Sequence, residues 1–345
     1  MRAYVLRRIA AAVLVLWAAY TLSFVLLSAL PGDAVTNKIQ NPEAQMSPES
    51  AAGLLEFYGL DRPLWQQYVH SLGALLQGDL GFSITNGRPV GQLIVDVVPD
   101  TLALAGTALI VGLLVAALVS ALSVYGPARW VRSAATAVPV FFASVPTFVV
   151  GILLLQVFAF KLFAIPAADD GSFTALLAPA VTLGVFVAAP LAQVFTRSIT
   201  NTRQQAFVHV LYARGAGERY VFARGILRNS SLPVLTLLGL AVGELIGGSV
   251  VTETIFSRPG LGQLTVSAVS TQDLPVLQGV VVVAALVYVV VNLVVDLVYP
   301  ALDPRILVTT VASTTSVKGL AGRLAHSGRR PSVHRSDLQA EAVMP

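Results

Sequence analysis

The side chains that most often perform chemistry are scarce in this sequence. It contains no cysteine, and its only lysines are Lys38, Lys161 and Lys318. None of these lysines closes a Gly-x-x-x-x-Gly-Lys-Ser/Thr loop, the motif that cradles nucleotide phosphates. The lack of cysteine also excludes disulfides, thiolate nucleophiles and thiolate metal sites. The chain itself is therefore not predicted to bind ATP through a P-loop.

The four histidines do not form a metal site in the sequence. His70, His209, His326 and His334 are scattered and match neither His-Glu-x-x-His nor another ligand spacing. No catalytic constellation is recognisable either, which argues against an intramembrane enzyme. We predict no catalytic residue, no metal site and no cofactor bound by this chain.

The composition indicates a membrane protein. Of 345 residues, 55% are hydrophobic and 12% are charged, and the mean hydropathy is +0.76. A soluble domain has about 25% charged residues. The apolar residues form long continuous runs, which suit helices crossing ~30 Å of hydrocarbon better than the short alternating strands of a barrel. We predict an all-α polytopic protein with six transmembrane helices at residues 9–30, 101–125, 134–160, 173–196, 232–251 and 277–302.

The basic residues predict the orientation. Placing both termini in the cytoplasm puts 17 of the 22 lysines and arginines on that side, as the positive-inside rule requires. The first apolar run is longer than the ~7–15 residues of a cleavable signal sequence, so we expect it to be a membrane span. Residues 1–8 are then a cytoplasmic N-terminus and 9–306 the transmembrane domain. Residues 307–345, rich in Ser, Thr, Gly and Arg, are predicted to be a disordered cytoplasmic tail.

Two polar segments interrupt the spans. The external loop 31–100 contains an amphipathic stretch at Leu64–Leu76 and is expected to fold on the outer surface. The cytoplasmic loop 197–231 places Phe207, Val210 and Leu211 at helical spacing before two glycines. This pattern predicts a short helix-break-helix hairpin that could dock in a groove of a soluble partner. It is equally consistent with an amphipathic helix lying on anionic lipid.

The cytoplasmic loop resembles the EAA loop of ABC importer permeases, in the form found in B-type permeases of the dipeptide and oligopeptide family. The similarity begins at Ala213-Arg214-Gly215 and ends at Leu232-Pro233. Further motifs extend it, in the family's order, over about residues 1–306. They are Leu30-Pro31-Gly32-Asp33, Gly59-Leu60-Asp61-Arg62-Pro63, Gly78-Asp79-Leu80-Gly81, Glu253-Thr254-Ile255-Phe256, Pro259-Gly260-Leu261-Gly262 and Leu302-Asp303-Pro304-Arg305.

The resemblance implies a type I ABC importer permease fold and a division of labour. A second homologous permease subunit, two ABC ATPase subunits carrying ATP and Mg²⁺, and an extracytoplasmic peptide-binding protein would be the partners. The complex would import di- or oligopeptides across the bacterial plasma membrane, although dipeptide, longer peptide, glutathione and nickel-complex substrates stay open. Residues carried over to the ATPase-coupling loop are Phe207, His209, Val210, Leu211, Ala213, Arg214, Gly215, Gly217, Leu232 and Pro233.

This loop departs from the family pattern at two places. His209 stands where glutamate is usual, and Val210 and Leu211 stand where small residues are usual. Gly215 is kept, and it could allow a sharp turn or a close approach to the partner. An ordinary helix C-cap is an equally good interpretation of that glycine.

Polar residues inside the predicted spans need a reason, because an ionisable group at the membrane centre costs ~2.5–3.5 kcal/mol. Glu244, Asn292 and Asp296 could line a translocation pathway for peptides, or they could make hydrogen bonds between helices. We favour the second role for Asp296. Gly243-x-x-x-Gly247 matches the small-xxx-small packing pattern. A secondary transporter is the competing class, but the inverted repeats that it would need are not evident.

Overall fold

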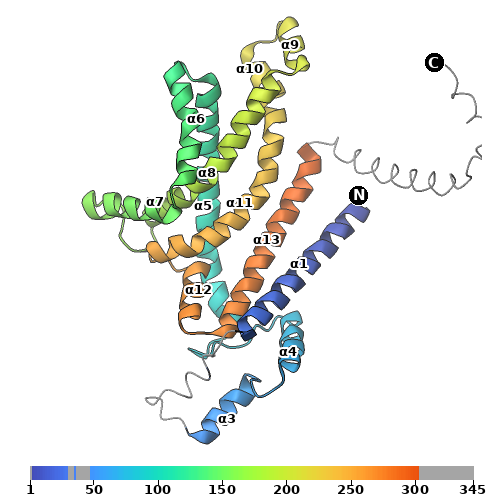
Figure 1. Ribbon diagram of the computed structural model, residues 1–345, viewed down its shortest axis with the longest axis vertical. Helices are drawn as coiled ribbons and strands as arrows, with labels where there is room; N and C mark the ends of the chain where they lie inside the picture. Colours follow the sequence, from blue (N-terminus) through green and yellow to red (C-terminus); the bar gives the residue numbers. More distant parts are fainter. Residues whose placement is uncertain (1, 30–34, 36–46, 303–345) are drawn as a thin grey trace, which may run out of the picture. The chain divides into compact units, whose positions relative to one another are not determined.

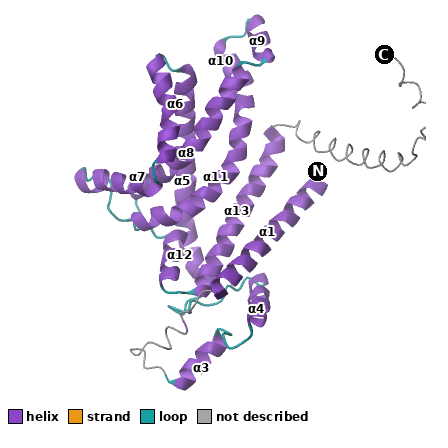
Figure 2. Ribbon diagram, viewed as in Figure 1, coloured by secondary structure: helices purple, strands orange, loops and turns teal. Residues whose placement is uncertain are grey.

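The computed structural model describes residues 2–29, 35 and 47–302 as helices joined by loops (Figures 1 and 2). The chain divides into two units, Met1–Val295 and Asp296–Pro345. The predicted tail at 307–345 and the Leu30-Pro31-Gly32-Asp33 motif fall outside the described residues. The helices are α1 (Arg2–Ala29), α3 (Pro48–Phe57), α4 (Leu64–Leu76), α5 (Val90–Tyr125), α6 (Arg129–Ser144), α7 (Thr147–Leu154), η2 (Leu155–Lys161), α8 (Phe173–Arg203), α9 (Ala206–Ala213), α10 (Glu218–Tyr220), η3 (Val221–Leu227), α11 (Arg228–Ile255), α12 (Leu261–Ser270) and α13 (Leu274–Leu302).

Five of the described helices are long and apolar enough to cross a membrane. A sixth span exists if α6 and the α7–η2 segment are counted together, but these two parts are bent by 100°. The continuous helix predicted at 134–160 is therefore interrupted. The break falls at Val145 and Pro146, because a residue before proline is driven into extended backbone and Val145 has φ −96° and ψ 123°.

Several helices are longer than their apolar runs. Helix α5 begins at Val90 instead of residue 101, and α8 continues to Arg203 instead of ending at 196. At 1.5 Å per residue, the 36 residues of α5 rise about 54 Å, well beyond the ~30 Å hydrocarbon core. The predicted loops 31–100 and 197–231 are accordingly shorter, because helix continues outside the membrane where charged side chains cost little.

The centre of the fold is the pairing of α5 with α8. Leu104 and Ala108 of α5 pack with Leu183 and Val187 of α8 in the largest buried cluster. Small residues bring the two backbones together: a Cβ on Gly184 would lie only 2.9 Å from the carbonyl oxygen of Ala108. Such close packing is how helices associate where lipid gives no hydrophobic drive. Helix α8 is the most enclosed of the candidate spans, and it leads directly into the helical hairpin that begins at α9.

Candidate coupling site

The loop that carries the sequence motif folds into a helical hairpin between α8 and α11. Helix α9 follows the end of α8 after two residues, and α10 and η3 then lead without interruption into α11. Figure 1 shows α9 and α10 at the tip of the α8–α11 pair. The predicted helix-break-helix hairpin is therefore present, and it is joined to a span on each side.

A small apolar core holds the hairpin in place. Ile199 of α8, Val208 of α9, and Val221 and Ile226 of η3 are all buried and in mutual contact. Val124, near the end of α5, packs against the same cluster. The hairpin is thus fixed to two spans by burial of branched aliphatic side chains, each of which stabilises by about 1.5–3 kcal/mol when fully buried.

Aromatic contacts strengthen the link to α5. The ring of Tyr125 meets Phe222 edge-on, with centroids 5.5 Å apart and an interplanar angle of 89°. The guanidinium of Arg203 lies 4.9 Å from the centroid of the same tyrosine ring. Edge-to-face and cation–π geometries are both favourable. The ends of α5 and α8 and the hairpin therefore form one packed unit.

Gly215 ends α9 in a Schellman motif. Its φ of +77° is the left-handed conformation that L side chains disfavour. Its N–H donates to the carbonyl of Tyr212 at 2.9 Å, and the N–H of Ala216 donates to the carbonyl of Leu211 at 3.1 Å. No neighbour lies within 4 Å of a Cβ placed on Gly215. Of the two interpretations left open by the sequence, the geometry supports the C-cap, and the glycine is needed for its backbone conformation.

Most of α9 is exposed. Val208 is buried and Leu211 half-buried, whereas the other six of the eight residues are exposed. Val210 is 48% exposed and Tyr212 45% exposed, so the outer side of α9, called the knob below, presents apolar surface. The remaining predicted coupling residues on this surface are also exposed: Phe207, His209, Ala213, Arg214 and Gly217.

The last two predicted coupling residues lie elsewhere. Leu232 and Pro233 are inside α11, which begins at Arg228, so they are part of a span and not of the exit from a loop. The turn before them is the π-helix η3, where the side chain of Asn229 donates to the carbonyl of Gly225 at 2.7 Å. Isolated π-helical turns often occur at functional sites. Nothing in the residue pattern had indicated this one.

The predicted pathway residues are not brought together. Glu244 is exposed on α11. Asn292 of α13 is half-buried, donates to the carbonyl of Tyr288 at 2.9 Å, and faces Gly239 so closely that a Cβ there would lie 2.5 Å from its Oδ1. Asp296 lies in α13, but its side chain is outside the described residues.

The glycines of α11 contact α13 one turn earlier than the sequence indicated. A Cβ on Gly243 would lie 2.8 Å from the ring of Tyr288, whereas a Cβ on Gly247 would meet no atom within 4 Å. The side chains of Asn292 and Tyr288 therefore lie against Gly239 and Gly243, and the predicted partner Gly247 takes no part in this contact. A glycine pair marks where two helices can approach, but the facing side chains decide which pair does so.

A buried polar cluster at the other end of α11 was missed as a functional feature. The carboxylate of Glu253, fully buried, accepts hydrogen bonds from Thr101 Oγ1 at 2.7 Å and from the backbone N–H groups of Gly262 and Gln263 at 2.7 and 3.3 Å. Thr101 Oγ1 in turn accepts from the N–H of Leu261 at 2.8 Å. Glu253 and Thr101 thus satisfy the free N–H groups at the start of α12 and tie that helix to α5 and α11.

Beside it, Arg258 bridges two further elements. Its guanidinium donates to Asp100 of α5 and to Asp169, which precedes α8, at 2.9 Å each. Arg258 and Asp169 are almost fully buried, with 7% and 6% of their side chains exposed. The glutamate within an apolar run, followed by an arginine and glycines, was the available signal. The separation of 158 residues between Asp100 and Arg258 concealed their pairing.

Structural comparison shows where this architecture occurs. Chains from two inward-facing crystal forms of the MetNI methionine ABC transporter superpose with a TM-score of 0.50, at 17% and 18% identity. Each match covers 61% of this chain and 96% of the other. At such identity the likeness concerns the fold alone. The protein is a multi-pass, all-helical membrane subunit with the fold of an ABC importer permease.

Family models cover nearly all of the described chain. The model "Binding-prot-dependent transport system membrane comp, N-term" matches residues 1–105, and "Binding-protein-dependent transport system inner membrane component" matches residues 104–308. The chain belongs to this family of inner-membrane transport components. The resemblance drawn from the loop motifs is confirmed, as are the inner-membrane location and the role as a non-catalytic permease subunit.

Relatives in the family include permeases of glutathione transport systems. The glutathione transport system permease protein GsiC of Escherichia coli O6:H1 and that of Escherichia coli K12 are each 33% identical over 307 residues. The GsiC protein of Salmonella choleraesuis is 34% identical over 303 residues. Each alignment covers 88% of this chain and 98% of the relative.

Proposed function

We propose that this permease subunit imports short peptides, glutathione among them, and that α9 is the surface on which a partner ATPase acts. The observation that carries the proposal is the construction of the hairpin. It exposes an apolar knob while its inner face is packed onto the ends of α5 and α8. A surface that must both bind a partner and transmit force requires this combination.

The geometry explains how a movement at α9 would reach the membrane. Val208 and Leu211 belong to the same apolar cluster as Ile199 of α8, and η3 continues directly into α11. A displacement of the knob therefore moves the ends of three spans together and does not merely bend a loop. Closure of two ATPase subunits on ATP would then rotate the permease halves and switch the pathway from inward to outward access. ATP and Mg²⁺ would be held by those subunits.

The exposed face of α9 suits a helix-in-groove contact. Phe207, Val210 and Tyr212 supply apolar anchors, and Arg214 stands at the end of the helix where a carboxylate of the partner could pair with it. Membership in an importer family favours such a protein partner over the lipid surface that the sequence left open.

The substrate assignment rests on the relatives. Permeases named for glutathione transport align over 98% of their own length, and glutathione is itself a tripeptide. We infer that the complex comprises this chain, a second homologous permease, two ATPases and an extracytoplasmic binding protein that delivers the peptide.

The proposal is tested in cells expressing the whole transporter. Val210→Glu places a charge on the knob. Val210→Ala is the matched control, because glutamate and alanine are both good helix formers. Uptake of labelled glutathione and dialanine, and co-purification of the ATPase, are measured for each. We expect Val210→Glu to reduce both at least 10-fold and Val210→Ala less than 3-fold.

The two readouts separate the parts of the proposal. Full ATPase retention and uptake in Val210→Glu would contradict the coupling role of α9. Co-purification of the ATPase with wild-type chain, without uptake of either peptide, would contradict the substrate assignment alone.

A further inference from the structure

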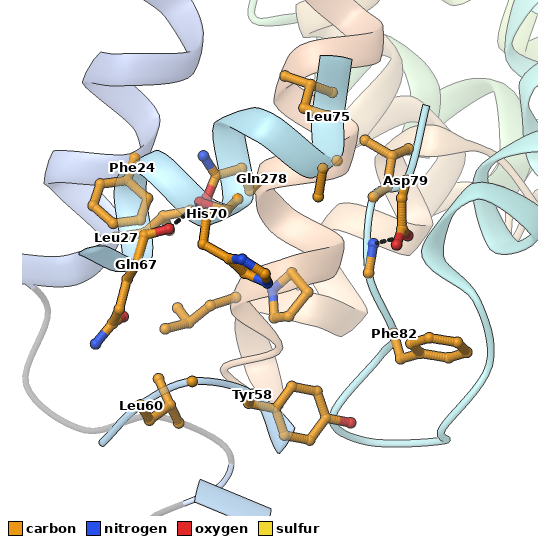
Figure 3. Close-up of a pocket in the computed structure, with 18 of the residues that line it drawn as sticks. Phe24, Leu27, Tyr58, Leu60, Gln67, His70, Leu75, Asp79, Phe82 and Gln278 are labelled. Atoms are coloured by element: carbon orange, nitrogen blue, oxygen red, sulfur yellow. Dashed lines mark hydrogen bonds between the residues drawn. The ribbon is translucent and has the colours of Figure 1, made fainter. Parts of the chain in front are cut away.

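A cavity of about 400 Å³ lies among α1, α3 and α4, the loop before α5, and the start of α13. Five segments surround it: the outer half of α1, the turn after α3, α4, the loop before α5, and the first turns of α13. Figure 3 shows Phe24 and Leu27 of α1, Leu75 of α4 and Gln278 of α13 around the same hollow. The volume falls in the range of ~300–1,000 Å³ typical of small-molecule sites.

Specific hydrogen bonds fix α4 against α1 on one side of the cavity. Trp17 Nε1 donates to the hydroxyl of Tyr68 at 3.1 Å, and the hydroxyl of Tyr20 donates to Ser71 Oγ at 2.8 Å. The ring of Phe24 meets that of Tyr68 edge-on at 5.3 Å. This wall is a defined contact between two helices.

The opposite wall is anchored by a buried carboxylate. Asp273, 2% exposed, accepts hydrogen bonds from Ser83 Oγ and from the backbone N–H groups of Ile84 and Thr85. The hydroxyl of Tyr58 donates to the carbonyl of Ser83 at 3.1 Å. Burial, and then the Asp273 carboxylate, raise the pKa of Tyr58. The cavity is therefore bounded by fixed elements.

The lining has two chemical regions. Phe24, Leu27, Leu75 and Leu274 form apolar walls. Two carboxylates, one guanidinium and one imidazole also line the cavity and are exposed, so they lie at its entrance. They belong to Glu56, Asp79, Arg62 and His70. Among the described residues, neither Glu56 nor Asp79 forms an ion pair with Arg62. A ligand here would meet a cation, two carboxylates and an apolar interior.

One wall residue has an unused donor. Gln278 is half-buried, and its Nε2 is fully buried without a hydrogen-bond partner in the part of the chain that the structure describes. A buried donor without a partner costs ~1–3 kcal/mol. A carbonyl oxygen of a bound molecule would offset that cost.

The position of the cavity favours a lipid over a water-soluble ligand. Trp17 lies 12 residues before Ala29, so α4 reaches about 18 Å down the side of α1. On α4, the large apolar side chains of Leu64, Trp65 and Val69 are 58–67% exposed. A second, almost wholly apolar hollow between α1 and α4 shares Phe24 with the first. An amphipathic helix at this depth, with its apolar face uncovered, suits the outer leaflet.

We propose that this cavity binds a phospholipid of the outer leaflet with a zwitterionic phosphoethanolamine headgroup. The phosphate would pair with Arg62 and His70, and the ammonium with Glu56 and Asp79. An ester carbonyl would accept from Gln278, and the upper acyl chain would lie against Phe24. Free glutathione could satisfy the charges, but it has no large apolar side chain to cover the apolar walls.

The test uses the complete transporter purified from vesicles of phosphatidylethanolamine and phosphatidylglycerol, examined by native mass spectrometry. Ala74→Trp fills the cavity from α4, and Leu76→Trp is its control because Leu76 is 81% exposed and does not line the cavity. Arg62→Gln removes the phosphate partner, with Arg88→Gln as the control for lost charge. We expect wild type and both controls to retain one phosphatidylethanolamine per chain, and Ala74→Trp and Arg62→Gln to lose at least 10-fold in retention.

A second lipid mixture tests the headgroup. Phosphatidylcholine lacks N–H donors for Glu56 and Asp79, so replacing phosphatidylethanolamine by it should lower retention several-fold. Equal retention in Ala74→Trp and wild type, or equal retention of phosphatidylcholine, would overturn the proposal. So would displacement of the lipid by added glutathione, which would make the cavity a peptide site.

Discussion

Replacing Glu253 by alanine should strongly destabilise the protein. The change removes the acceptor of two buried hydrogen bonds, from Thr101 Oγ1 and the N–H of Gly262, and of a partly buried one from the N–H of Gln263. A buried donor left unsatisfied costs ~1–3 kcal/mol, and partial relaxation lowers the sum. We therefore expect a loss of about 3–5 kcal/mol, which corresponds to a fall in melting temperature on the order of 10 °C.

A graded series makes the reasoning testable. Glu253→Gln keeps one acceptor oxygen for the α12 amides, so it should lose only about 1–2 kcal/mol. Glu244→Ala is the matched control, because Glu244 lies on the same helix and is exposed. It should stay within about 0.5 kcal/mol of wild type. The assay is thermal unfolding of the purified protein in detergent. Melting temperatures for Glu253→Ala and Glu244→Ala that agree within error would refute the proposal that Glu253 stabilises the contact of α11 with α5 and α12.

Two further substitutions probe backbone geometry. At Gly215, whose φ is +77°, asparagine should be tolerated, whereas valine should cost about 1–2 kcal/mol. Hydrogen exchange at the backbone N–H groups of residues 215 and 216 should therefore accelerate roughly 5–30-fold in the valine variant only. Unchanged exchange in that variant would contradict the C-cap assignment. At Gly184, valine would press on Val111 and the Ala108 carbonyl, so melting should fall by several degrees, whereas Gly247→Val meets nothing within 4 Å and should have little effect; equal effects would argue against the close α5–α8 contact.

Much of the architecture was predictable because membrane insertion depends on local composition. Every apolar run is helical, although the run at 134–160 is divided between α6 and the α7–η2 segment, since only helices satisfy the backbone of a single segment inside lipid. The limits of the helices were less predictable. Charged residues such as Asp96 and Arg197 look like loop signals, yet both are helical because helices continue into water. A proline such as Pro146 can kink a helix, but the sequence did not reveal a 100° change of direction there.

The hairpin between α8 and α11 could be located from sequence, but the division of its side chains between core and surface could not. Helical spacing found the hairpin, whereas the division into buried Val208 and exposed Val210 depends on where Ile199 and Val221 lie in space. The Glu253 and Arg258 clusters were hidden for the same reason. Their side-chain partners are 89–158 residues distant in the sequence, and no local pattern records that separation.

The chain contains no cysteine, so a single introduced cysteine can report on α9 without background. The most direct measurement is crosslinking of Val210→Cys to the partner ATPase in membranes, using a short reagent with one thiol-reactive and one photoactivated end. The control is Leu76→Cys on α4, because Leu76 is 81% exposed and Val210 48% exposed. The account predicts a permease–ATPase adduct for Val210→Cys that changes in yield when ATP is added, and none for Leu76→Cys. Absence of the adduct at Val210 in a transporter that still imports peptide, or its appearance at Leu76, would contradict the coupling role of this hairpin.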